Sequence, residues 1–155
     1  MRPRFAAALL LGCLAVSASG CTTGGGRPAL SPDDTVRAAQ QLLIERCLTR
    51  QGFTPPRPGE PRPDSADARR VTDAYFGSGR AELSLTLPSG HTVSQHTDGC
   101  LAAAQRRLYG DVGRWFRVST SVNNLKAKAA PQDRAAFREL REQALGRAAA
   151  ILAER

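Results

Sequence analysis

Apolar residues recur at intervals of three and four along most of this chain, and that spacing is typical of amphipathic α-helices. The pattern predicts helices over residues 32–51, 66–75, 98–109, 112–129 and 131–151. One segment alternates with a period of two instead, which predicts a β-hairpin over residues 82–95. Elements of this kind are expected to form a mainly α-helical domain, in which the apolar faces of the helices pack on one another.

The first predicted helix carries start and stop signals at its two ends. Residues 31–34 (Ser-Pro-Asp-Asp) supply a serine N-cap, a proline at the first helical position and two acids at the positive end of the helix dipole. Gly52 is placed to end the helix as a left-handed cap, with Phe53 folding back onto the last turn. Cys47 faces the core, because it belongs to an apolar stripe of Val36, Gln40, Leu43 and Cys47, flanked by Ala39, Ile44 and Leu48.

A proline-rich stretch and a short helix come next. Residues 54–65 contain five prolines and no periodicity, so we expect an internal polyproline-like loop, with a proline-rich recognition motif as the alternative. Asp64 or Ser65 then caps the short helix, which buries Val71 and Tyr75.

The alternating segment contains the ingredients of a hairpin. Leu83, Leu85 and Leu87 alternate with polar residues, residues 88–90 (Pro-Ser-Gly) have turn chemistry, and residues 92–95 can pair back. A two-stranded ribbon is only marginally stable alone. If this hairpin forms, its leucine face must therefore pack on helices.

The third helix is capped by Thr97 or Asp98 and reaches Tyr109, with Cys100 on its buried face. Asp111 caps the fourth helix, which carries a heptad-like seam of Trp115, Val118, Val122, Leu125 and Ala129.

Pro131 opens the last helix, which has a matching apolar stripe of Phe137, Leu140, Ala144, Ala148 and Ile151. On its surface Arg138 and Glu142 have the spacing of an i,i+4 ion pair. The fourth and fifth helices are expected to form a C-terminal antiparallel helical hairpin. The alternative is that the seam binds a partner or a second copy of the chain.

The N-terminus has the pattern of an export signal. Arg2 and Arg4 form a positive segment, residues 5–16 are apolar without charge, and residues 18–20 (Ala-Ser-Gly) are small and precede Cys21. This ending resembles the lipobox of bacterial lipoproteins, with alanine where a leucine is usual, and implies that residues 1–20 are removed and Cys21 is lipidated. The apolar run is too short, at about 1.5 Å per residue, to cross a hydrocarbon core of about 30 Å as a helix.

Two alternatives for this N-terminus are lipidation at Cys13 after Leu10-Leu11-Gly12, and ordinary secretion without a lipid. Under the favoured interpretation, residues 21–30 form a flexible glycine-rich tether and residues 31–155 form one domain. The protein is then expected at the outer face of the cell membrane, held in the lipid bilayer by acylated Cys21.

Export changes the meaning of the remaining cysteines. Cys13 leaves with the signal and Cys21 carries lipid, so Cys47 and Cys100 remain as a pair outside the cytoplasm. We expect a disulfide between them, which makes the fold class a small disulfide-linked helical domain. The alternative is two buried free thiols.

The net charge restricts the classes of partner. The formal charge of +8 includes Arg2 and Arg4 of the signal, so +6 remains in the mature chain. No nucleic-acid module is recognisable and few aromatics are available to stack on bases, so nucleic acid is not an expected partner. An envelope protein or an anionic envelope polymer fits better, although the arginines are dispersed along the chain.

The residues that usually carry chemistry do not form a known pattern. His91 and His96 are the only histidines, and their spacing of five puts them on opposite faces of a strand, with only Asp98 nearby. The sequence therefore predicts no catalytic residue, no metal ligand and no cofactor site. Trp115 and Phe116, flanked by Arg114 and Arg117, form a candidate partner or ligand surface. The alternative is that Trp115 is a core anchor with solvated arginines on either side.

Short motifs around the two cysteines carry a family resemblance. They are residues 45–48 (Glu-Arg-Cys-Leu), 51–53 (Gln-Gly-Phe), 99–101 (Gly-Cys-Leu) and 108–111 (Leu-Tyr-Gly-Asp). In these motifs the chain resembles small exported lipoproteins of high-GC actinobacteria, over about half of the mature chain. The resemblance implies export and a disulfide but no activity, since those proteins are largely of unknown function. The final helix here lacks the additional Trp and Cys of some relatives.

Location and architecture together predict a non-enzymatic binding or accessory module of the cell envelope. The alternative is a cell-wall enzyme or enzyme regulator, which a pocket joining His91, His96 and a carboxylate would favour. A flat apolar groove beside Trp115 would favour binding. A purely structural lipoprotein is a third possibility.

Overall fold

Helices dominate the computed structural model, which describes residues 29–57, 59 and 64–154. Its elements are α1 (Pro32–Arg50), α2 (Ala66–Phe76), β1 (Leu83–Thr86), β2 (Thr92–Gln95), α3 (Cys100–Tyr109), α4 (Val112–Leu125), a short 3-10 turn (Lys126–Lys128) and α5 (Pro131–Ala153). The expected mainly α-helical fold with one hairpin is confirmed. The predicted signal, Cys21 and most of the tether lie outside the described residues, and no described helix has the length and apolarity needed to span a membrane.

Helix α1 begins and ends as its sequence predicts. The Ser31 side chain accepts a hydrogen bond from the backbone N–H of Asp34 at 3.2 Å. At the other end Gly52 has a φ of 81°, and the N–H of Phe53 donates to the carbonyl of Leu48 at 3.0 Å. This hydrogen bond and the packing of Phe53 on the Leu48 cluster form a Schellman cap, which turns the chain back onto the helix.

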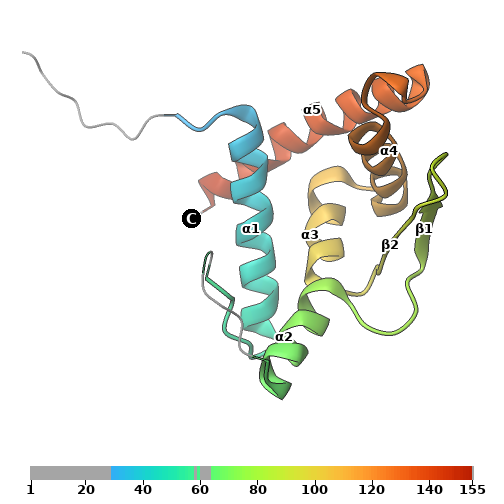
Figure 1. Ribbon diagram of the computed structural model, residues 1–155. Coiled ribbons are helices and arrows are strands. Elements are labelled where there is room, and N and C mark those ends of the chain that lie inside the picture. Colours follow the sequence, from blue (N-terminus) through green and yellow to red (C-terminus); the bar gives the residue numbers. More distant parts are fainter. Residues whose placement is uncertain (1–28, 58, 60–63, 155) are drawn as a thin grey trace, which may run out of the picture.

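Helix α3 lies at the centre of the molecule. Figure 1 shows it between α1 and α4, with α5 passing across the upper part of α1 and the upper end of α3. One buried cluster joins α1, α3, α4 and α5 through Ala39, Leu108, Tyr109, Val118, Leu140, Ala144, Ala148 and Ile151. A second joins α1 and α3 through Ile44, Leu48, Cys100 and Ala104. Because α3 contributes to both, it is buried on more than one side.

Helices α4 and α5 form the expected antiparallel hairpin. Ser121, late in α4, contacts Asp133 near the start of α5. Arg114, early in α4, contacts Glu139 further along α5, so the two helices run in opposite directions. The predicted seam is only partly correct, since α4 ends at Leu125 and its buried residues are Phe116, Val118, Thr120 and Ser121. These residues span two faces because the β-hairpin covers a second side of α4.

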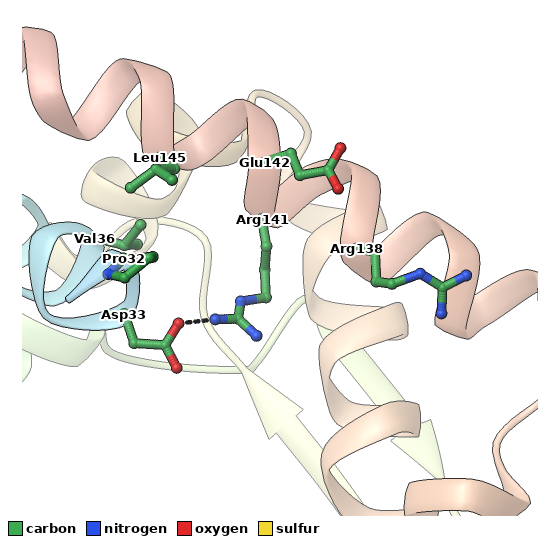
Figure 2. Close-up of a pocket in the computed structure, with 7 residues that line it drawn as sticks. All are labelled: Pro32, Asp33, Val36, Arg138, Arg141, Glu142 and Leu145. Carbon is green, nitrogen blue, oxygen red and sulfur yellow. Dashed lines mark hydrogen bonds and ion pairs between the residues drawn. The ribbon is translucent and has the colours of Figure 1, made fainter.

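One surface prediction on α5 is wrong. Arg138 and Glu142 form no ion pair with each other among the described residues, and in Figure 2 no dashed line joins them. The ion pairs of α5 are instead made to other helices, by Glu139 to Arg114 at 2.8 Å and by Arg141 to Asp33. These charged side chains of α5 therefore pair with residues of α1 and α4 instead of with each other.

The β-hairpin packs its apolar face inward. Leu85 pairs with Val93, and Leu83 pairs with Gln95, in an antiparallel register that keeps all four on the half-buried face. Leu87, just beyond β1, is buried. The packing of β1 on α4 supplies the support that an isolated two-stranded ribbon lacks.

Two glycines meet where the hairpin leads into α3. A Cβ atom on Gly99 would lie 2.4 Å from the backbone N of Gly77 and 2.7 Å from the carbonyl oxygen of Tyr75. Gly99 is also the N-cap of α3 and makes no side-chain cap bond, so the expected cap at Thr97 or Asp98 is wrong. Backbone contact with the end of α2 requires glycine at this position, and that requirement overrides the usual preference for a capping side chain.

We expect Gly99→Ala to lower the free energy of unfolding by about 1–3 kcal/mol, because the added methyl group would overlap backbone atoms. Gly146→Ala is the matched control. Gly146 lies inside α5 with open space around it, so this substitution is expected to raise stability by about 0.5–1 kcal/mol. Urea unfolding followed by circular dichroism measures both, and equal effects of the two variants would contradict the close contact.

Candidate functional site

Cys47 and Cys100 form a disulfide that joins α1 to the first residue of α3. The two sulfur atoms are 2.04 Å apart and the Cα atoms 5.7 Å apart. Cys100 is fully buried, and the side-chain amide of Gln51 donates to its sulfur at 3.3 Å. The expected pairing is confirmed, and the alternative of two free thiols is wrong for this structure.

Trp115, the centre of the predicted partner surface, is packed between helices. Its ring stacks on Tyr109 with centroids 3.6 Å apart, and on Phe137 at 5.5 Å. Burial raises the pKa of the Tyr109 phenol to about 12, because the ionised form would lose its hydration. These contacts agree with the interpretation of Trp115 as a core anchor.

The other three residues of that predicted surface point in different directions. Arg114 pairs with Glu139 of α5, Phe116 is buried, and Arg117 is exposed. Phe116 and Arg117 line an open groove of about 290 Å³ against β1, with Glu82, Leu83, Ser84, Leu85 and Gly113. The structure therefore does not gather the four residues on one face, and partner binding by this surface stays a prediction.

A second cleft lies on the other side of Phe116, and we call it the hairpin cleft. It has a volume of about 290 Å³ and is lined by Phe76, Val93, Ser94, Gln95, His96, Leu101, Phe116, Ser119 and Thr120. Phe76 is 43% exposed, which is unusual for a large apolar side chain in this molecule. The lining thus combines aromatic surface with hydroxyl and amide groups, as ligand-binding clefts commonly do.

His96, at the edge of the hairpin cleft, lies beside two carboxylates. One side-chain donor atom from each of Glu82, His96 and Asp98 falls within 4.8 Å of the other two, and we call these residues the His96 cluster. The Nδ1 atom of His96 is buried and has no hydrogen-bond partner in the described part of the chain. His91 lies elsewhere, exposed beside the hairpin turn.

Sequence reasoning missed the His96 cluster because Glu82 and His96 are separated by the whole hairpin. The pairing of Leu83 with Gln95 places the residues just outside that pair, Glu82 and His96, next to each other. The hairpin register was therefore the signal that could have revealed the cluster.

A third hollow lies between the start of α1 and the middle of α5. It has a volume of about 190 Å³ and is lined by Pro32, Asp33, Val36, Arg138, Arg141, Glu142 and Leu145. Figure 2 shows the Arg141 side chain reaching across to the Asp33 carboxylate, while Pro32, Val36 and Leu145 gather beside them. The Asp33–Arg141 ion pair in this hollow joins the start of α1 to α5.

Comparison with known proteins shows no matching family model, no matching curated protein and no matching solved structure.

We expect a Cys47→Ala/Cys100→Ala variant to lose about 4 kcal/mol of stability, because the disulfide closes a loop with a sequence separation of 53. The measurement is urea unfolding of the full chain carrying Cys13→Ala and Cys21→Ala, which removes the other thiols. Wild-type protein reduced before unfolding should match the variant. Two reactive thiols in the denatured, unreduced protein would contradict the pairing.

Proposed function

We propose that this protein is an exported lipoprotein, held at the outer face of the cell membrane by acylated Cys21. The N-terminal pattern of charge, apolar run and small residues supports export. The Cys47–Cys100 disulfide is the observation that carries the proposal, because disulfides form and persist in oxidising compartments outside the cytoplasm. The disulfide and the signal pattern lie in separate parts of the chain, so they support the proposal independently.

In this proposal the domain is a non-enzymatic binding or accessory module, and the hairpin cleft is its binding site. Phe76 offers exposed aromatic surface, and Ser94, Ser119 and Thr120 offer hydroxyl groups beside it. Such a lining suits an extended segment of an envelope protein, which has apolar side chains and backbone hydrogen-bonding groups to match. Ser94 and Phe76 in this lining are exposed, so a chain segment can reach the cleft from solvent.

The alternative is a cell-wall enzyme or enzyme regulator, and one observation favours it. His96 lies with two carboxylates at the edge of the hairpin cleft, which is an arrangement that can support acid–base or metal-assisted chemistry. A pocket that joins both histidines and a carboxylate would favour an enzyme, but His91 lies outside the His96 cluster. Binding therefore remains the leading proposal.

Metabolic labelling with a fatty acid tests the anchor. We expect label on the wild-type chain and none on a Cys21→Ala variant, because the acyl chain is attached through that sulfur. Cys13→Ala is the matched control, and it should keep the label, since Cys13 leaves with the signal. Label that depends on Cys13 instead of Cys21 would overturn the assignment of the lipidated cysteine.

Site-specific crosslinking in cells tests the binding site. A photoreactive residue at Phe76 should give a discrete adduct with an envelope component, whereas the same residue at Ala149, exposed on α5, should not. Ser94→Arg adds bulk and charge at the exposed rim of the cleft, and should lower the yield of that adduct several-fold. Equal adducts at positions 76 and 149 would contradict a specific site.

A further inference from the structure

We infer that Glu82, His96 and Asp98 form a binding site for a divalent transition-metal cation, with zinc as the favoured ion. The three side chains bring one imidazole nitrogen and two carboxylate oxygens within 4.8 Å of one another. Imidazole and carboxylate are common zinc ligands, whereas calcium and magnesium sites are built almost entirely from oxygen. The nitrogen donor therefore favours a transition metal.

The fold holds the three donors in place from two directions. On one side, the N–H of Thr97 donates to a carboxylate oxygen of Glu82 at 2.8 Å, which ties this side chain to the segment that carries His96. On the other side, Asp98 and His96 lie against Gly77, where any Cβ atom would overlap both side chains. Hydrogen bonds to ligating carboxylates and tight packing are the features that orient metal ligands in proteins.

The charges of the cluster are available to a cation. Asp33, Asp34, Asp64, Asp67 and Glu139 pair with arginines, but Glu82 and Asp98 form no ion pair within the described ranges. The two carboxylates match the charge of a divalent ion, and an imidazole binds a metal as a neutral ligand.

His96 supplies the independent observation. Its Nδ1 atom is buried without a hydrogen-bond partner in the part of the chain that the structure describes. Buried polar atoms are normally satisfied, since leaving one unpaired costs free energy. A cation held by the His96 ring would give this imidazole the polar partner that no hydrogen bond among the described residues provides.

Small rotations complete the coordination. Donors around a tetrahedral zinc are about 3.3 Å apart, as follows from zinc–ligand distances of about 2.0–2.1 Å, so the side chains of Glu82 and Asp98 must close inward slightly. Both residues are exposed, so a small side-chain rotation can close this gap within the contacts described above. Three protein ligands leave one position for water or a ligand group, and because His96 also lines the hairpin cleft, that position is close to the proposed binding site.

Isothermal titration with zinc chloride tests this site on the full chain carrying Cys13→Ala and Cys21→Ala, with the disulfide intact and no histidine tag. We expect one zinc per chain and a rise of several degrees in the melting temperature. His96→Ala, Asp98→Asn and Glu82→Gln should each weaken binding by about tenfold or more. An excess of magnesium should not displace the zinc.

The matched controls are His91→Ala, which removes the other histidine, and Glu142→Gln, which removes a carboxylate on α5. Both should bind zinc as tightly as the parent chain. Asp98→Asn and Glu82→Gln keep the shape of exposed side chains, and an unchanged circular dichroism spectrum excludes misfolding as the cause of weaker binding. Absence of saturable binding, or equal binding by His96→Ala, would overturn the site without affecting the fatty-acid labelling and crosslinking results.

Discussion

The link between Cys47 and Cys100 holds the centre of this molecule together. Cys100 is the first residue of α3, the helix that belongs to both buried clusters, and the disulfide fastens that end covalently to α1. The preceding residue, Gly99, is in close contact with the backbone at the end of α2. One covalent bond and one glycine contact therefore position three helices relative to one another, and the remaining packing of α4 and α5 is built around the fixed α3.

The same constraint restrains the segment that carries the proposed metal site. Residues 96–98 connect the hairpin to α3, and they are held by the strand register on one side and by Gly77 on the other. A connecting segment restrained at both ends can keep polar side chains in a fixed arrangement, as loops on rigid scaffolds often do at binding sites. The proposed metal site and the hairpin cleft share His96, so an ion bound there would lie beside any ligand in the cleft.

At Trp115 two local sequence patterns predict opposite environments for the side chain. Its flanking arginines suggest an exposed surface, yet its helical spacing suggests a core position, and sequence alone leaves both open. In the structure the ring stacks on Tyr109 and Phe137, Arg114 pairs with Glu139, and Arg117 remains exposed. Adjacent residues on a helix point about 100° apart, so a contiguous motif such as 114–117 is distributed around the helix instead of forming one surface.

The sequence by itself determined the helices, the caps at Ser31, Gly52 and Asp111, the hairpin and the cysteine pairing, because each depends on neighbouring residues or on a small number of candidates. Only the tertiary structure decided the glycine N-cap at Gly99, the end of α4 at Leu125, the ion pairs of α5, and the approach of Glu82 to His96. These features depend on which surfaces meet in space. The choice is made by packing between distant segments, which local periodicity does not encode.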